Sequence, residues 1–254
     1  MEKKFISIVL PIHNQADHVR GIIDSYVETL NRLPVEYELV LVLNGCRDQS
    51  ADICRELSQR YKVIHLVETE KSGWGHAVRL GLMASKGHWV CYTNSARTPA
   101  NDLSIFILYA IANPDSVIKA NRKIRDSFRR RIGSLLYNIE CRTLFDLSNW
   151  EVNGTPKIFP RKFEDLLHLE REDDLIDLEF NYRCKLNSYP MLEIPILSSK
   201  RHGGKSTTGL KSAVRLYWGA FKMWRRIKEI QPYEKHERQS TALAAASADL
   251  EKSA

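Results

Sequence analysis

The chain has 254 residues, 43% of them hydrophobic, which is enough to build one large α/β domain with a sizeable core. Its five cysteines show no Cys-x-x-Cys spacing, so we expect neither a structural metal site nor a disulfide framework. The formal net charge is +7. No run of about 18 apolar residues occurs, so we expect a cytoplasmic protein, at most peripheral on the cytosolic face of a membrane.

Strand-like and helix-like patterns alternate in the first part of the chain. Short apolar runs rich in β-branched residues predict buried strands over 5–12, 38–43, 63–67 and 88–93. Helical spacing of apolar residues predicts helices over 19–30, 51–61 and 74–85. This alternation predicts a right-handed, doubly wound, mostly parallel sheet whose functional loops follow the carboxyl ends of the strands.

Polar and glycine-rich blocks occupy those loops. They read Pro11-Ile12-His13-Asn14-Gln15, Leu43-Asn44-Gly45-Cys46-Arg47-Asp48 and Lys71-x-Gly73-x-Gly75-x-Ala77. Glycines let a backbone approach a ligand closely, and the start of a helix favours anions. We therefore expect these blocks to face one crevice, although a glycine-rich turn also serves simply to start a helix.

Basic residues concentrate in two segments, 119–131 and 200–228, while the rest of the chain is net acidic. Two such clusters favour an anionic partner, such as phosphate groups, an anionic membrane or nucleic acid. No nucleic-acid-binding signature accompanies them, so a nucleic-acid partner is not expected.

The end of the chain is predicted to carry an amphipathic, basic and aromatic helical segment, 208–231, followed by a disordered tail, 232–254. Trp218, Phe221 and Trp224 cluster towards one side of the helix and basic residues towards the other, which is typical of a membrane interface. The alternative interpretation is a helix packed on the domain with its cations in solvent.

In order and spacing, the blocks resemble the family 2 glycosyltransferases, especially the dolichol and polyprenol phosphate sugar synthases. Later elements add to this resemblance: Asp177-Leu178-Glu179, Glu193-Ile194-Pro195-Ile196 and Arg201-His202-Gly203-Gly204-Lys205-Ser206. The resemblance implies an α/β domain of the GT-A fold over 1–207, with a mostly parallel sheet flanked by helices. It also implies transfer of a sugar from a nucleotide diphosphate donor to a polyprenyl or dolichyl phosphate acceptor.

The resemblance also assigns roles to individual residues. The donor would be bound by Pro11, His13, Asn14, Asn44, Asp48, Lys71, Gly73, Gly75, Asn94, Ser95 and Ala96. Phosphate and acceptor would be bound by Arg122, Arg131, Ser134, Glu179, Arg201 and Ser206. The catalytic residues would be Arg201 and, for a hydroxyl acceptor that needs a base, Asp174. An acidic cap at the start of the following helix is the alternative interpretation of Asp173 and Asp174.

One family element is missing. The stretch that should carry the metal-binding Asp-x-Asp reads Tyr92-Thr93-Asn94-Ser95-Ala96-Arg97-Thr98, and Gln15 and Asn44 also stand where family members carry acids. The Mg²⁺ or Mn²⁺ of the family prefers carboxylate oxygens, so we expect no metal ligands here. No cofactor is certain, and Mg²⁺ or Mn²⁺ stays open although the acids of its site are missing. Either cationic side chains replace the metal or the chain is a catalytically inactive, nucleotide- or phosphate-binding relative. A transferase acting on a hydroxyl acceptor is a further alternative.

Overall fold

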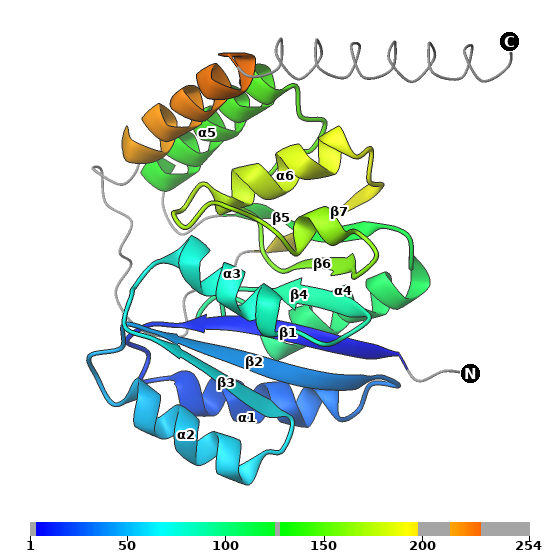
Figure 1. The fold of residues 1–254 in the computed structure, drawn as a ribbon. Helices are drawn as coiled ribbons and strands as arrows, with labels where there is room; N and C mark the ends of the chain where they lie inside the picture. Colours follow the sequence, from blue (N-terminus) through cyan, green and yellow to red (C-terminus); the bar gives the residue numbers. More distant parts are fainter. Residues whose placement is uncertain (1–3, 125–127, 198–213, 230–254) are drawn as a thin grey trace, which may run out of the picture.

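The computed structural model describes residues 4–124, 128–197 and 214–229 (Figure 1). At its centre is a seven-stranded sheet in the order β3-β2-β1-β4-β6-β5-β7. The strands are β1 (Phe5–Ile12), β2 (Glu36–Asn44), β3 (Ile64–Thr69), β4 (Trp89–Tyr92), β5 (Val117–Ile124), β6 (Lys157–Pro160) and β7 (Met191–Leu197). The strand β6 runs antiparallel to both of its neighbours, β4 and β5, and the other pairs are parallel.

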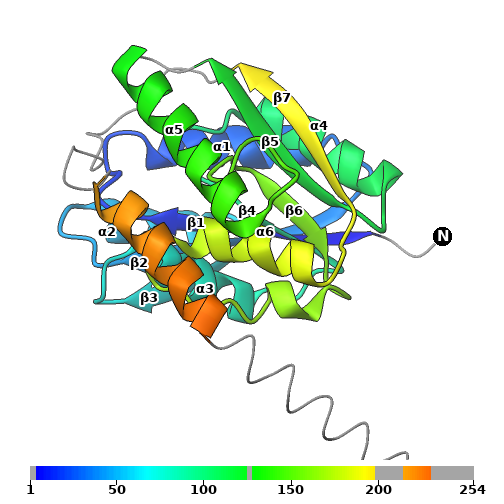
Figure 2. The same ribbon diagram turned by 90° about the horizontal axis from the view of Figure 1, so that it is seen from above.

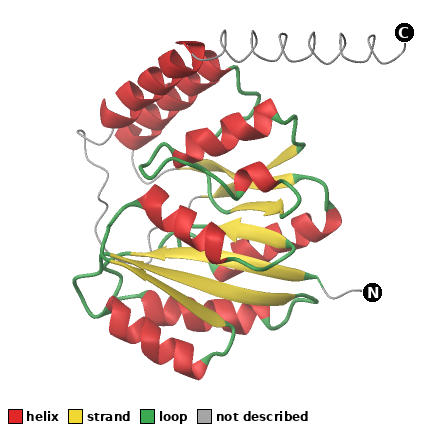
Figure 3. Ribbon diagram, in the orientation of Figure 1, coloured by secondary structure: helices red, strands yellow, loops and turns green. Residues whose placement is uncertain are grey.

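Helices cover both faces of the sheet, as Figure 3 shows by the red layers on either side of the yellow strands. They are α1 (Val19–Leu30), α2 (Ser50–Arg60), α3 (Trp74–Ala84), α4 (Ala100–Ala112), α5 (Phe128–Phe145) and α6 (Ile176–Leu186), with a short 3-10 helix at Glu164–Leu166. The first four strands and the first three helices lie where the sequence predicts them, and the mostly parallel α/β sheet is confirmed.

Two apolar cores lie on opposite faces of the sheet, because successive side chains of a strand point to opposite sides. One core joins α1, α2 and α4 to side chains such as Ile8 and Leu10 of β1. The other joins α3 and α6 to Val9 of the same strand. The fold thereby fixes the carboxyl ends of β1, β2 and β4 at one edge of the sheet.

Residues 214–229 form a further helix, which we call the C-terminal helix. It lies beside α5 in both views of the ribbon (Figures 1 and 2). A third apolar cluster joins it to the domain and includes Tyr137 of α5, Leu175 and Ala220. The predicted site residues Arg201 and Ser206 and the predicted disordered tail, 232–254, lie outside the described residues.

Candidate functional site

Hydrogen bonds join the loops that follow β1 and β2. His13 Nδ1 lies 2.7 Å from the backbone carbonyl of Asn44, and Asn14 Oδ1 accepts a hydrogen bond from the Arg47 amide at 2.8 Å. A carbonyl only accepts, so His13 Nδ1 carries the hydrogen and Nε2 is left as an acceptor for the Asn14 amide, 3.3 Å away. Three predicted donor-binding residues, His13, Asn14 and Asn44, are thus brought together.

The turn after β2 needs a glycine. Gly45 has a φ of +61°, and a Cβ there would lie 2.9 Å from the Glu70 carbonyl oxygen. A side chain at this position would be strained and would collide with the backbone. The glycine therefore lets the segment before α3 pass close to the end of β2.

Asp48 lies exposed at the start of α2. Its two carboxylate oxygens accept hydrogen bonds from the backbone amides of Ala16 and Ser50, each at 3.0 Å. Burial acts in the opposite direction, but these hydrogen bonds hold the pKa of Asp48 below its ordinary value. The Asp48 carboxylate is therefore held in place by backbone amides, beside the loops that follow β1 and β2.

Asn44 connects three parts of the site. Its side-chain Nδ2 donates to the Ile12 carbonyl at 2.8 Å, and its Oδ1 accepts from the Gly73 amide at 3.2 Å. The side chain is only 3% exposed. It donates and accepts at once, which an amide can do and a carboxylate cannot.

The glycine block packs against the chain's own segment 171–173. A Cβ on Gly75 would lie 2.4 Å from the Asp173 carbonyl oxygen, and the His76 amide donates to the Glu172 carbonyl at 2.9 Å. The close backbone approach predicted for a ligand is therefore made, at Gly75, by a protein segment almost a hundred residues away. The Glu172 side chain pairs with Lys71 and, at 2.8 Å, with Arg79.

The turn after β4 is closed by side-chain hydrogen bonds. The hydroxyls of Thr93 and Thr98 lie 2.7 Å apart, and Ser95 donates to Gln15 Oε1 at 2.9 Å. Gln15 in turn donates to the Pro11 carbonyl at 3.3 Å and is buried. Ala96 is fully buried.

This turn does not fit a divalent cation. In place of two carboxylates it offers the half-buried amide of Asn94 and the buried methyl group of Ala96. Mg²⁺ and Mn²⁺ are held by hard oxygen ligands, above all carboxylates. Across the described ranges there is no group of three or more His, Cys, Asp or Glu side chains placed to hold a metal.

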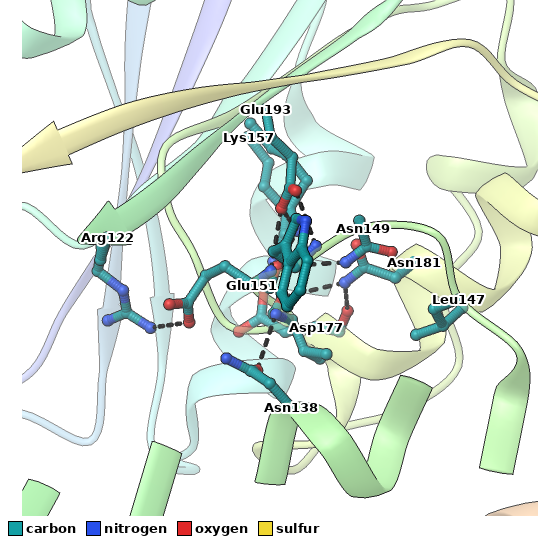
Figure 4. Close-up of polar contacts among 12 residues, drawn as sticks. Arg122, Asn138, Leu147, Asn149, Glu151, Lys157, Asp177, Asn181 and Glu193 are labelled. Atoms are coloured by element: carbon teal, nitrogen blue, oxygen red, sulfur yellow. Dashed lines mark hydrogen bonds and ion pairs between the residues drawn. The ribbon is translucent and has the colours of Figure 1, made fainter. Parts of the chain in front are cut away.

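A second polar region lies where β5, β6 and β7 meet α6 (Figure 4). We call it the charge cluster, and it consists of Lys119, Arg122, Glu151, Lys157, Asp177 and Glu193. Arg122 pairs with Glu151 at 2.7 Å, Lys119 with Glu193 at 3.3 Å, and Lys157 with Asp177. Its three cations face three carboxylates, so the cluster is balanced when all six are ionised.

The two lysines of the charge cluster are completely buried. Burial, reinforced by the positive charge of Lys157, lowers the pKa of Lys119 to about 8, although Glu193 and Glu151 act in the opposite direction. Burial also lowers the pKa of Lys157, against the effect of Asp177. Arg122 is one of the predicted phosphate-binding residues, and the two lysines are not, because their only signal in the sequence is a charged residue inside a short apolar strand.

Asp177 is held from several elements. Its carboxylate accepts hydrogen bonds from the Tyr92 hydroxyl at 2.9 Å and from Trp74 Nε1 at 3.1 Å, besides pairing with Lys157. Tyr92 ends β4 and Trp74 begins α3. Asp177 therefore joins the charge cluster to the end of β4 and the start of α3, at the edge of the sheet where the loops after β1, β2 and β4 meet, which we call the donor edge after its predicted role.

The remaining predicted phosphate-binding residues are more scattered. Glu179 is buried and accepts hydrogen bonds from the amides of Glu170 and Arg171, and it pairs with Arg183 at 2.7 Å. Arg131 is exposed and Ser134 half-buried, both in the first half of α5. Glu179 is thus engaged with its own loop and helix, whereas Arg122 belongs to the charge cluster.

The acidic loop before α6 carries Asp173 and Asp174. Asp173 accepts a hydrogen bond from the Leu175 amide at 3.1 Å and pairs with Arg171. The N-cap of α6 is Leu175, and no side chain caps the helix, so Asp173 is not the acidic helix cap of the alternative interpretation. Asp174 instead has a raised pKa, caused by partial desolvation and by the carboxylates of Asp173 and Asp177, and opposed by Arg215 of the C-terminal helix. A raised pKa is typical of a group that exchanges protons.

The paired helices expose a set of apolar side chains. On α5 these are Ile132, Leu135, Leu136 and Ile139, and on the C-terminal helix Val214, Trp218 and Phe221. The Tyr217 hydroxyl donates to the Gly133 carbonyl at 2.5 Å, and the rings of Tyr137 and Tyr217 meet edge to face. Among the helices that the structure describes, none has the length and apolar character needed to cross a membrane.

The chain is similar to known proteins in sequence and in fold. Residues 7–166 match the sequence model of the family described as glycosyl transferase family 2. The undecaprenyl-phosphate 4-deoxy-4-formamido-L-arabinose transferase of Edwardsiella ictaluri is 24% identical over 219 residues, which cover 85% of this chain and 66% of that protein. The glycosyltransferase GlyA of Streptococcus pneumoniae is 29% identical over 90 residues, 35% of this chain and 12% of that protein. The chain thus spans just under two thirds of the first relative and far less of the second.

Solved structures of similar fold include glucosyl-3-phosphoglycerate synthase from Mycobacterium tuberculosis. Its complex with Mn²⁺, UDP and glucosyl-3-phosphoglycerate superposes with a TM-score of 0.65, at 14% identity, over 86% of this chain and 77% of that one. Its complex with phosphoglyceric acid gives a TM-score of 0.66 over the same shares. This likeness shows the fold.

Proposed function

The chain belongs to glycosyl transferase family 2, and we propose that it transfers a sugar from a nucleotide diphosphate donor to a polyprenyl phosphate. Its fold is the predicted GT-A fold. The observation that carries the proposal is that the family match covers the loops after β1, β2 and β4, which hydrogen bonds join at one edge of the sheet. The named relatives that act on undecaprenyl phosphate support the choice of acceptor.

We place the donor against the loops that end β1, β2 and β4. The nucleoside would lie between the β1 and β2 loops, where Asp48 offers a fixed carboxylate to ribose hydroxyls. The proposed donor-binding residues are Pro11, His13, Asn14, Asn44, Asp48, Lys71, Gly73, Gly75, Asn94, Ser95 and Ala96. Asn44 and Gly75 would act by shaping this edge, because their contacts are with the protein itself.

The acceptor phosphate would lie towards β5 and α5. Arg122 is partly exposed, and its guanidinium group suits the oxygens of a phosphate. We propose that Arg131, Ser134, Arg201 and Ser206 complete this region, with Glu179 holding the loop at 170–171. A lipid phosphate is already an anion, so its attack on the sugar needs no general base.

A hydroxyl acceptor is the second candidate, and Asp174 favours it. Attack by a hydroxyl needs a base, and the raised pKa of Asp174 brings this carboxylate closer to the neutral range in which general bases work best.

We also propose peripheral contact with the cytosolic face of a membrane. The apolar side chains exposed on α5 and the C-terminal helix lie beside the exposed cations Arg131, Arg215, Lys222 and Arg226. Aromatic and basic side chains together suit a bilayer interface.

The test of the proposed function is a transfer assay. The protein is incubated with radiolabelled nucleotide sugars, one at a time, and with undecaprenyl phosphate in anionic vesicles. We expect label in the lipid fraction with at least one donor. Label that appears only on water-soluble hydroxyl compounds would favour the second candidate, and UDP or GDP binding without any transfer would indicate a binding protein of the same fold.

A further inference from the structure

We infer that this chain binds the diphosphate of its donor without a divalent metal ion, because the donor edge is built around neutral side chains. The inference rests on the proposed function, since it concerns the same donor site. Beyond that function, the inference states which groups compensate the negative charge of the diphosphate.

The first neutral position is Gln15, in the loop between β1 and α1. Its amide nitrogen donates to the Pro11 carbonyl and its amide oxygen accepts from Ser95, so the side chain bridges β1 to the turn after β4. A glutamate would keep the second bond and lose the first, and it would bring a charge to a side chain that is 6% exposed. The packing here requires an amide.

The second neutral position, Asn44, is constrained in the same way. Its donor and acceptor atoms are both used, on the Ile12 carbonyl and the Gly73 amide. An aspartate would set its negative charge against the Ile12 carbonyl oxygen. A carboxylate could therefore not replace Gln15 or Asn44 without loss of a hydrogen bond, because each side chain both donates and accepts as a neutral amide.

The third neutral position is the turn after β4 itself. Ala96 is fully buried and has no ligand atom, and the Ser95 hydroxyl is turned to Gln15. The same turn carries Arg97, a half-buried cation. Where two aspartates would hold a metal, this turn thus contains one basic residue and no acidic one. A cation fixed near a departing diphosphate stabilises it as a metal does.

Calorimetric titration with UDP, GDP, CDP and ADP tests the inference. Each nucleotide is titrated into the protein in EDTA and again with Mn²⁺. We expect at least one to bind in EDTA with an affinity within about tenfold of that in Mn²⁺. A larger loss of affinity in EDTA would overturn the inference and leave the proposed function standing. Failure of all four to bind in either buffer would overturn the proposed donor and the inference with it.

Two substitutions test the turn directly. Asn94→Asp combined with Ala96→Asp should create Mn²⁺ binding, seen as loss of the free-ion electron paramagnetic resonance signal, which the parent protein leaves unchanged. Because Ala96 is buried, Asn94→Asp alone is the variant to use if the pair does not fold. Asn101→Asp is the control for Asn94→Asp, since it adds the same single negative charge on α4. Mn²⁺ binding by the parent protein would contradict the inference.

Arg97→Gln tests the replacement cation. We expect UDP or GDP, whichever binds the parent protein, to bind about tenfold or more weakly in EDTA. Arg32→Gln, beyond the far end of α1, is the control and should leave affinity unchanged. Equal affinities of Arg97→Gln and the parent protein would remove Arg97 from the inference.

Discussion

The Asn44 side chain accepts a hydrogen bond from the Gly73 amide, 29 residues further along the chain, and so holds the end of β2 against the start of α3. The same side chain donates to β1. One buried amide therefore fixes three segments of the donor edge.

Asn44→Asp should destabilise the protein by about 1–3 kcal/mol, because a buried donor is replaced by a charge facing a carbonyl oxygen. The free energy of unfolding in urea at pH 7 measures this. Asn101→Asp, at an exposed position in the first turn of α4, is the control. Equal stability of the two variants would mean that the Asn44 bonds contribute little.

Gly75→Ala should destabilise by about 1–3 kcal/mol, because its Cβ would lie 2.4 Å from the Asp173 carbonyl oxygen. Gly21→Ala in α1 is the matched control, since a Cβ there meets nothing within 4 Å. That control should gain on the order of 0.5–1 kcal/mol from helix propensity. Thermal and urea unfolding of both variants would show shifts of opposite sign, and shifts of the same sign would contradict the packing described for Gly75.

The pKa of Lys119 predicts a pH dependence of stability. This pKa is about 8 in the folded protein and about 10.4 in an unfolded chain, so between these values the unfolded state binds more protons. The free energy of unfolding should therefore rise with pH in this window, by on the order of 1–2 kcal/mol between pH 8 and 9.5. Below about pH 7 both states are protonated and the contribution is constant.

Lys119→Met isolates this contribution from other titrating groups. The difference in unfolding free energy between the parent protein and the variant should change over the same pH window. A difference that stays constant from pH 7 to 9.5, measured by urea unfolding, would show that Lys119 keeps an ordinary pKa.

Asp174→Asn separates the two acceptor classes. With a polyprenyl phosphate acceptor we expect kcat to change by less than about tenfold, because no base is needed, and with a hydroxyl acceptor to fall by about 10²–10⁴-fold. The assay is initial-rate transfer with each acceptor. Asp173→Asn, which changes the neighbouring carboxylate that pairs with Arg171, is the control for a general effect on the loop. Strong loss with polyprenyl phosphate would contradict the base-free mechanism.

Binding to anionic vesicles should depend on Trp218 and Phe221, which are 57% and 37% exposed. Changing both to Ser should release the protein in co-sedimentation, whereas Met83→Ser, an exposed side chain on α3, should not. Each basic residue near the surface adds about 1 kcal/mol at low salt, so high salt should also weaken binding. Protein that stays in the supernatant with anionic vesicles at low salt would contradict the membrane proposal.

The sequence predicted the first four strands and three helices because their apolar periodicity is strong and local. Local patterns could not show that β6, with four residues and a buried lysine, runs antiparallel to both of its neighbours. The sequence also could not show why position 75 needs a glycine. The contact that requires it is with the backbone of 171–173, which only the tertiary fold brings there. Likewise, the charge cluster joins side chains as far apart as Lys119 and Glu193, 74 positions, and no local pattern encodes such a pairing.

Asp174 and Arg215 give the acidic loop a link to the paired helices. The guanidinium lowers the carboxyl pKa, so protonation of Asp174 weakens their attraction and, by reciprocity, removal of Arg215 favours the protonated acid. An anionic headgroup that competes for this arginine would therefore raise the pKa of Asp174 further. The protonation of a side chain beside the donor edge would then report whether the C-terminal helix is bound to lipid.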